Sequence, residues 1–517
     1  MRVLMLDKNI LVDRRIDLFS MSLKRLGHET RLLYLEPPQG FDERFSVDIE
    51  AIPVGNEAVS SAAVSNGVFL QPSHVRDVLY PFSIDGRTRQ EEFESLRKNL
   101  IGDSERLGLR DSIKLALAFP DVARRLIRGR SKLSAREVLA TWMLGIASAP
   151  LYLQERLAPP VDGYPKASPT GVPLTHFDQA CVRHAVEVYK PDIVTANDFP
   201  TLRAALTIKM LVGTPVVYDA HELYSYQPGI EPLAARRIFA EERQLLKHID
   251  GLIVMNESQA RITERDFGYR GQYAVCTNAT NRPAGFDVNR RYDLFRQKLP
   301  IPSSHKIMLF QGGVNIPRRI DYLLRGLSKA RRSDVHMVFL TWGREVDDFK
   351  VMAEQLGISS RVHFLPFVDW DEVLFYAASA DCGFMPYQAT DQNTSISSPN
   401  KMYEFIMAGT PMIGSSDLYY VNQIVGGQGF GVVRPLRADV DYALAIEEMF
   451  DERLGGPERF RAALIEKGDA YSWDNEVRGA IRMYEAIHSE SSQAMYLPKV
   501  HVKARRVQAS EISGLGE

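Results

Sequence analysis

The sequence predicts an α/β protein with two consecutive doubly wound parallel sheets. Short apolar strands alternate with amphipathic helical segments over residues 1–35 and 176–275, and the same rhythm returns over 307–433. Between the two halves, residues 282–304 are polar and contain three prolines, which is typical of a linker. Because alternating strands and helices form parallel sheets with crossover helices, each half is expected to be one domain.

The first half opens with a strand, a helix and a second strand. Its helix carries apolar residues at a spacing of three and four, and Gly27 is expected to end it. The expected strands of this half are Val3–Leu6, Thr30–Leu35, Asp192–Ala196, Pro215–Tyr218 and Gly251–Met255, and the half ends near Val275. The expected helices are Ile16–Leu26, Phe177–Tyr189, Leu202–Leu211 and residues 232–248.

Residues from about 40 to 175 interrupt this rhythm. They show little strand periodicity and several amphipathic stretches, so we expect a largely helical insertion. A basic cluster at 124–136 precedes the uncharged stretch 138–153, which Pro150 interrupts. Such a pair forms either a buried insertion with a solvated flank or a surface that lies on an anionic membrane. Peripheral contact of residues 124–153 with the inner membrane is therefore the alternative to a plain helical insertion.

The second half supplies six further strands. They are expected at Ile307–Gln311, His336–Thr341, Val362–Leu365, Cys382–Met385, Pro411–Gly414 and Gly431–Val433, with helices between them. We therefore expect an N-terminal domain over residues 1–290, including the insertion, and a C-terminal domain over 291–470. Residues 491–517 are rich in Ser, Lys and Arg and are expected to form a flexible tail.

Composition excludes several classes of protein. Of the 517 residues, 45% are hydrophobic and 25% are charged, which is ordinary for a globular protein and excludes collagen and coiled coil. Lys and Arg number 63 and Asp and Glu 65, so the net charge of −2 argues against a bulk nucleic-acid binder. The three cysteines contain no CxxC pair, which argues against a zinc site or a disulfide framework. We expect a cytoplasmic protein, with peripheral contact with the cytoplasmic membrane face as the alternative.

The first motif with chemistry is Tyr218-Asp219-Ala220-His221-Glu222, directly after an expected strand. Asp219 and His221 share one face of an extended segment. A histidine held by a carboxylate can bind a sugar hydroxyl or take part in proton transfer. The structural alternative is a strand end with Asp219 as a helix N-cap.

The second motif is Gln311-Gly312-Gly313-Val314-Asn315, followed by Arg318 and Arg319. Glycines after a strand let backbone N–H groups approach an anion, and arginines pair with a diphosphate. The spacing differs from GxGxxG, so it gives no dinucleotide fingerprint. A tight turn with solvated arginines is the alternative.

The third motif, Ser397-Ser398-Pro399-Asn400-Lys401, opens an expected helix. Free N–H groups at a helix start attract phosphate, and Lys401 adds charge. Glu404 follows one turn later and can face the same cleft, where a carboxylate suits a ribose diol. The alternative is a capped surface helix with a Lys–Glu pair. Separately, Asp369-Trp370-Asp371 matches the DxD pattern of some metal sites, but an N-cap with an acidic first turn explains it better.

Together these residues resemble family 4 glycosyltransferases of the GT-B fold. The resemblance covers roughly residues 1–40 and 175–490 and leaves the insertion uncovered. It rests on Pro191-Asp192-Ile193, Tyr218 to Glu222, Gln311-Gly312 through Arg318, Leu323-Leu324, Val362 to Val368, Leu374 to Pro386, Glu404 with Ala408 to Ile413, Ser472-Trp473 and Tyr484. It implies two Rossmann-like domains that face a cleft, with a C-terminal helix at 471–490 that crosses back to the first domain.

The resemblance also implies roles for single residues. Arg318, Lys401 and His221 are expected in catalysis, with the two cations on the donor diphosphate and His221 near the transferred sugar and the acceptor. Glu404 is expected on the nucleotide ribose and Val368 at the base. The remaining donor-side residues are Gly312, Gly313, Ser397, Ser398 and Asn400, and Asp219 and Glu222 are placed on the acceptor side. No metal and no cofactor is expected.

The resemblance implies a retaining glycosyltransferase that moves a sugar from a UDP- or GDP-linked donor to a glycan, lipid-linked or protein acceptor. Bacterial surface polysaccharide or glycoconjugate synthesis is the expected setting. Two positions depart from the family pattern, because Ile396 replaces its first Glu and Gly313 replaces its phosphate Arg. The candidates to replace the missing Glu are backbone N–H groups near Ser395–Ser398 or the side chains of Asn393 and Thr394. A catalytically degenerate GT-B protein that binds a sugar nucleotide or a partner is therefore the first alternative, and a sugar-nucleotide epimerase of the same architecture is the second.

Overall fold

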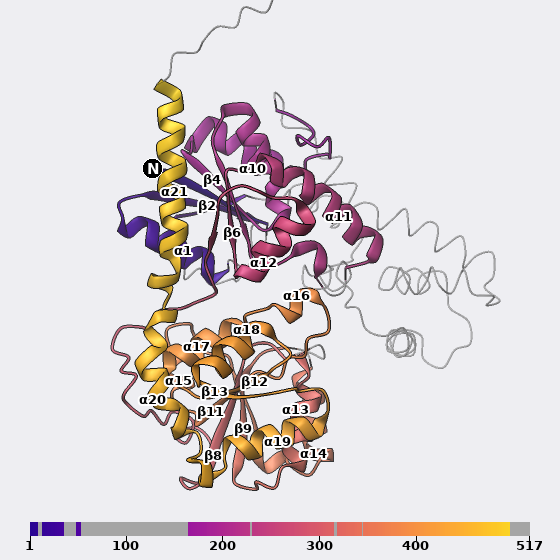
Figure 1. Ribbon diagram of the computed structural model, residues 1–517, viewed down its shortest axis with the longest axis vertical. Coiled ribbons are helices and arrows are strands. Elements are labelled where there is room, and N and C mark those ends of the chain that lie inside the picture. Colours follow the sequence, from indigo (N-terminus) through magenta and orange to yellow (C-terminus); the bar gives the residue numbers. More distant parts are fainter. Residues whose placement is uncertain are drawn as a thin grey trace, which may run out of the picture.

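The computed structural model describes residues 1–8, 13–35, 48–52, 164–227, 230–314, 318–343 and 345–496. Within these residues the chain forms two parallel sheets, each accompanied by helices, and the two resulting domains lie one above the other in Figure 1. The predicted 124–153 segment lies outside the described residues, as does the C-terminal segment from 497 onward.

The N-terminal sheet has seven parallel strands in the order β3-β2-β1-β4-β5-β6-β7. β1 pairs with β2 on one side and with β4 on the other, so that Met5 lies opposite both Leu32 and Thr195. The strands are β1 Arg2–Asp7, β2 Glu29–Leu35, β3 Asp48–Ile52, β4 Ile193–Asn197, β5 Val216–Ala220, β6 Gly251–Val254 and β7 Tyr273–Val275.

Strand β3 is a short strand within residues 40–175 that the sequence analysis did not predict, and most of the remaining insertion lies outside the described residues. Its sequence, DIEAI, carries two acidic residues, which are uncommon in strands, and is too short for a clear periodicity. Its parallel pairing with β2 supplies the backbone hydrogen bonds that local propensity does not predict.

Four helices of the N-terminal domain match the predicted segments to within a few residues, whereas α12 was not predicted. The predicted Phe177–Tyr189 helix divides into α9 and a π-helical turn at His184–Tyr189. The α-helices are α1 Arg14–Arg25, α9 His176–Arg183, α10 Phe199–Val212, α11 Pro232–Leu245 and α12 Glu257–Ile262.

The C-terminal sheet has six parallel strands in the order β10-β9-β8-β11-β12-β13. The strands are β8 Lys306–Gln311, β9 Val335–Thr341, β10 Val362–Pro366, β11 Cys382–Phe384, β12 Met412–Ser415 and β13 Gly431–Arg434. The helices are α13 Ile320–Lys329, α14 Val346–Gln355, α15 Val373–Ala377, α16 Gln392–Ser395, α17 Asn400–Ala408, α18 Tyr419–Val421, α19 Asp439–Met449 and α20 Glu458–Lys467.

Both sheets reverse their strand order once. The reversal lies between β1 and β4 in the first sheet and between β8 and β11 in the second. Ligands of doubly wound sheets bind at such switch points, beyond the carboxyl ends of the strands. The two points where a ligand is expected are therefore the segments after β1 and β4 and the segments after β8 and β11.

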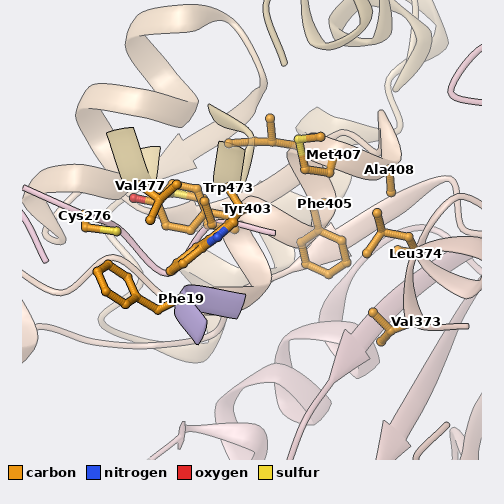
Figure 2. Close-up of a cluster of buried hydrophobic side chains, with 14 of the residues drawn as sticks. Phe19, Cys276, Val373, Leu374, Tyr403, Phe405, Met407, Ala408, Trp473 and Val477 are labelled. Carbon is orange, nitrogen blue, oxygen red and sulfur yellow. The ribbon is translucent and has the colours of Figure 1, made fainter. Parts of the chain in front are cut away.

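One hydrophobic cluster joins the two domains. Alternate residues of β1 face opposite sides of the sheet, so Val3 and Met5 belong to this shared cluster whereas Leu4 and Leu6 pack on the other face. Figure 2 shows Phe19, Trp473 and Tyr403 in the shared cluster, from helices α1, α21 and α17 respectively.

Helix α21, Trp473–Tyr496, connects the C-terminal domain to the first sheet. It follows α20 of the C-terminal domain and packs against α1, β6 and β7 of the N-terminal domain, as Figure 1 shows. The Trp473 indole N–H donates to Ser22 Oγ at 2.9 Å, and the Tyr484 hydroxyl lies 2.7 Å from Thr195 Oγ1. The helix continues to Tyr496, six residues past the predicted end at 490, so residues 491–496 are helical and do not belong to the predicted tail.

Candidate functional site

Two cations meet at the end of β8. Gly312 follows the strand with a φ of +113°, which L side chains rarely adopt. A Cβ atom at Gly312 would lie 3.4 Å from both the Arg318 Nη1 and the Lys401 Nζ atoms. The glycine therefore permits a backbone path along which a guanidinium and an ammonium converge, at the switch point of the C-terminal sheet.

Aromatic rings hold Lys401 in this position. The residue lies in the first turn of α17 and is buried. Its ammonium is 4.9 Å from the centre of the Phe310 ring and 4.8 Å from that of Tyr387, and it hydrogen-bonds to the Tyr387 hydroxyl. These contacts aim the charge at Gly312 without neutralising it.

Arg318 is bound to the loop that precedes it. Its Nη1 donates to the Gly313 carbonyl at 2.6 Å. A Cβ at Gly313 would lie 3.3 Å from the Trp342 indole nitrogen, so this glycine lets the loop pass close to the tryptophan. A side chain at position 313 would require Trp342 to shift by a few tenths of an ångström, and Arg318 supplies a guanidinium to this loop.

Glu404 lies one turn beyond Lys401 on α17, as its spacing predicts. The Gln311 side-chain amide donates to Glu404 Oε2, which ties the carboxylate to the end of β8. Burial raises the pKa of Glu404, and the Lys401 charge, the Gln311 hydrogen bond and the Arg14 charge oppose this rise. The end of β8 thus combines two cations with one carboxylate.

The segment after β10 presents aromatic rings beside Val368. The Phe367 ring lies between Trp342 and Trp370, with centroid distances of 4.7 and 5.4 Å. Both tryptophans are exposed, at 53% and 40%, which is uncommon for rings of this size. Val368 packs its side chain against the shared hydrophobic cluster.

The Ser397–Asn400 segment differs from a capped helix start. The N-cap of α17 is Pro399, which makes no side-chain capping bond. Ser398 is buried, and Asn400 is exposed with its Oδ1 accepting from Asn278 Nδ2 of the N-terminal domain at 2.6 Å. Asn400 therefore joins the two domains, a contact that the motif alone does not predict.

His221 lies between carboxylates. Its Nε2 is 3.6 Å from Asp219 Oδ2, and its Nδ1 is 3.6 Å from Asp198 Oδ2 and 3.9 Å from Asp13 Oδ2. Burial alone would lower the pKa of His221, but the charges of Asp198 and Asp219 outweigh it and raise the pKa to about 10. At neutral pH the ring is therefore an imidazolium, and the role of a proton acceptor does not suit it.

Asp219 and Asp198 are held differently. Asp219 forms a two-pronged ion pair with the buried Arg15, with distances of 3.0 and 3.1 Å. Burial of Asp219 works against its ionisation, but the Arg15 and His221 charges hold its pKa well below the usual range. Asp198 accepts the His221 backbone N–H at 3.0 Å from a strained backbone with φ of 58° and ψ of 166°.

Glu222 binds across the domain interface. Asn393 of α16 donates to its Oε2 at 3.0 Å and accepts the Leu223 N–H at 3.2 Å. Burial raises the pKa of Glu222 to about 7, and the nearby Asp198 charge adds to the rise. Glu222 therefore takes part in domain contact as well as lying on the predicted acceptor side.

Ile396 makes a similar contact from α16. Its side chain packs on a hydrophobic cluster of the N-terminal domain, and its carbonyl accepts from Asn256 Nδ2 at 2.9 Å. The two side chains that could substitute for the missing Glu are also engaged. Asn393 binds Glu222, and Thr394 donates its backbone N–H and its hydroxyl to Asp391, the N-cap of α16. The position where the resemblance implies a sugar contact thus serves the interface between the domains.

Arg14 was missed by sequence reasoning. It begins α1, and its guanidinium stacks on Trp370 at 5.0 Å while Nη2 donates to Thr280 at 3.3 Å. Its Nε and Nη1 atoms are buried with no hydrogen-bond partner. Burial lowers the pKa of Arg14, and the charge of Glu404 across the interface opposes this.

The structure therefore gathers the predicted residues into two groups. Gly312, Gly313, Arg318, Lys401 and Glu404 meet after β8, and Asp219, His221 and Glu222 meet after β5. Asp198, which sequence reasoning also missed, follows β4, so the rule that polar residues just past strands matter would have found it. The sequence signal for Arg14 is weaker, because only its contact with Trp370 of the C-terminal domain shows that it belongs to the site.

No group of three or more His, Cys, Asp or Glu side chains is arranged to hold a metal ion among the residues that the structure describes. Over the same part of the chain, no helix combines the length and apolar character that crossing a membrane requires.

Two family models match the chain. One, described as a glycosyl transferase 4-like domain, matches residues 134–279, and the other, described as glycosyl transferases group 1, matches residues 292–470. An uncharacterised glycosyltransferase of Methanocaldococcus jannaschii is 26% identical over 317 residues, which are 58% of this chain and 76% of that protein.

Solved structures share the two-domain architecture. Sucrose-phosphate synthase from Thermosynechococcus elongatus superposes with a TM-score of 0.59 at 12% identity, over 95% of this chain and 99% of that one. Anabaena HepE in complex with UDP superposes with a TM-score of 0.56 at 12% identity, over 94% of this chain and 100% of that one. At these identities the similarity concerns the fold.

Proposed function

The chain belongs to the GT4-type glycosyltransferases of the GT-B fold, and on this premise we propose that it transfers a sugar with retention from a nucleotide-sugar donor. The acceptor is a glycan, a lipid-linked molecule or a protein, and the setting is surface polysaccharide or glycoconjugate synthesis. This proposal requires a donor diphosphate at the end of β8 and an acceptor on the His221 side.

The convergence of Arg318 and Lys401 on Gly312 carries the proposal. A nucleoside diphosphate leaves with negative charge, and preorganised cations at the leaving oxygen stabilise the transition state. Glu404, one helical turn from Lys401, suits the ribose diol because an ionised carboxylate accepts two hydroxyl donors. The structures of HepE with UDP and with UDP-glucose support a donor of the nucleotide-sugar class.

In the proposed reaction the bond between the sugar C1 and the diphosphate oxygen breaks, and a bond from the acceptor oxygen to C1 forms on the same face. The acceptor proton passes to the departing diphosphate oxygen, so no protein base is required. Arg318 and Lys401 then stabilise the leaving group. His221, as an imidazolium between Asp198 and Asp219, contributes a fixed positive charge beside the reacting sugar.

A second candidate function is supported by Ile396. Since its side chain packs on the N-terminal domain and cannot accept a hydrogen bond, the sugar lacks the partner that the family's first Glu provides. A relative that binds a sugar nucleotide without transferring the sugar would show this feature. Hydrolysis of UDP- and GDP-sugars by the purified protein in the absence of acceptor supports the enzyme, and nucleotide binding without any turnover supports the binding protein.

The donor site is tested by Glu404→Ala. Loss of the carboxylate is expected to weaken UDP or GDP binding by about 1.5–3 kcal/mol in calorimetry, the scale of a charged hydrogen bond. Glu466→Ala is the matched control, because Glu466 is exposed on α20. Equal nucleotide affinity of the Glu404 variant and the control variant would refute the ribose role.

A further inference from the structure

Two buried guanidinium nitrogens of Arg14 lack hydrogen-bond acceptors. Nε and Nη1 have no hydrogen-bond partner, although the side chain is packed between the two domains. A buried unpaired donor costs roughly 1–3 kcal/mol, more when it is charged, so such groups in a native protein call for an explanation. A ligand that brings an acceptor to this place would remove the cost.

The surroundings of Arg14 restrict the chemistry of this ligand. Arg14 comes from α1 of the N-terminal domain, whereas its neighbours Trp370, Asp371 and Glu404 belong to the C-terminal domain. Three carboxylates, those of Glu404, Asp371 and Asp17, act on the guanidinium charge, and they disfavour a phosphate, which has no proton to offer them at neutral pH. A hydroxyl group suits the position, because it accepts from Arg14 and donates to a carboxylate at the same time.

The diphosphate has its own cations elsewhere. Arg318 and Lys401 flank Gly312, and Glu404 lies one helical turn from Lys401 and interacts with the Arg14 charge. A nucleotide with its diphosphate at Gly312 would therefore bring its ribose to Glu404, which is the role proposed for that residue. The same ribose would come within reach of Arg14.

We propose that Arg14 is a nucleotide-binding residue supplied by the N-terminal domain. Its guanidinium donates a hydrogen bond to a ribose hydroxyl, and the same hydroxyl donates a hydrogen bond to Glu404. This inference rests on the proposed function. It makes the ribose a contact point of both domains, so that a bound nucleotide links α1 to α17. The stacking of Arg14 on Trp370 holds the guanidinium plane ready for this contact.

The test compares ribose hydroxyls directly. UDP, GDP and the 2′-deoxy and 3′-deoxy analogues of the better ligand are titrated by calorimetry into the wild type, Arg14→Gln and Arg14→Lys. Arg25→Gln is the matched control, since Arg25 lies on the same helix with an exposed ion pair to Asp474. Thermal melts of all variants without ligand report whether each one is folded.

Arg14→Gln is expected to weaken binding of the ribonucleotide about 10- to 100-fold, the equivalent of a charged hydrogen bond. It is expected to weaken binding of at least one deoxy analogue much less, while Arg14→Lys recovers part of the affinity and Arg25→Gln changes nothing. Equal losses for the ribonucleotide and both deoxy analogues, or no loss at all, would overturn the inference and leave the proposed function standing. Failure of the folded wild type to bind any of these nucleotides would overturn both.

Discussion

The charge on His221 offers the sharpest test of this site. The ring lies 3.6 Å from carboxylates on both sides and is only 11% exposed, and its pKa rises from 6.5 to about 10. Because one pH unit corresponds to about 1.4 kcal/mol, this rise corresponds to a stabilisation of the order of 5 kcal/mol. Replacing His221 with Gln would also leave Asp198 buried without its cation, so a large loss of stability is expected at neutral pH.

The pH dependence of this loss has a definite sign. Between pH 6.5 and about 10 the folded protein keeps a proton on His221 that the unfolded chain has released. The stabilisation is therefore complete below pH 6.5 and falls as the pH rises, by about 1.4 kcal/mol per unit. The difference in free energy of unfolding between the wild type and His221→Gln is expected to shrink by about 3 kcal/mol from pH 7 to pH 9.

Urea unfolding of both proteins at several pH values measures this difference. His248→Gln is the control, because His248 is exposed and its loss removes an imidazole without a buried partner. An NMR titration of the histidine rings, with the His221 signal identified by its absence in the variant, gives the pKa directly. A His221 ring that titrates near pH 6.5, or a stability difference that stays constant from pH 7 to 9, would refute the imidazolium and restore the proton acceptor as a role.

Two further predictions concern the glycine and the isoleucine at the domain interface. Gly312→Ala is expected to destabilise the protein by about 1–3 kcal/mol in urea unfolding, because the φ of +113° strains any L side chain, and to weaken nucleotide binding. Gly427→Ala is the control, because Gly427 has open space around it and an ordinary backbone conformation. Equal stability of the two variants would contradict the strain. Ile396→Glu is expected to lower the midpoint of thermal unfolding without raising turnover, since a carboxylate would replace an apolar contact with the N-terminal domain. Faster sugar-nucleotide turnover in this variant would show instead that a Glu at position 396 contacts the donor sugar.

The domain interface also explains why single motifs mislead in this chain. Asn393 and Thr394 look available as substitutes for the missing Glu when only the order of residues is known. In the structure Asn393 is hydrogen-bonded to Glu222 and the Leu223 backbone, and Thr394 to Asp391. A polar side chain in a site segment is therefore available to a ligand only when no other residue of the protein already hydrogen-bonds to it.

Local pattern determined the two sheets and half of the candidate site. Strands buried on both faces appear as short apolar runs, so every strand except β3 and β7 was predicted to within about two residues. Gly312 and Gly313 directly follow a strand, and Lys401 and Glu404 stand three apart on one helix. Such arrangements depend on distance along the chain, and a sequence states that distance directly.

Tertiary structure alone decided the charges and the partners. His221 meets Asp198 and Asp13 because parallel strands bring their carboxyl ends to one edge, and only that meeting makes the ring an imidazolium. Arg14 reaches the neighbourhood of Glu404 across nearly the whole chain, and Ile396 finds an apolar surface on the other domain. Electrostatic and packing energies depend on distance in space, and the relative placement of two domains sets those distances without leaving a local mark in the sequence.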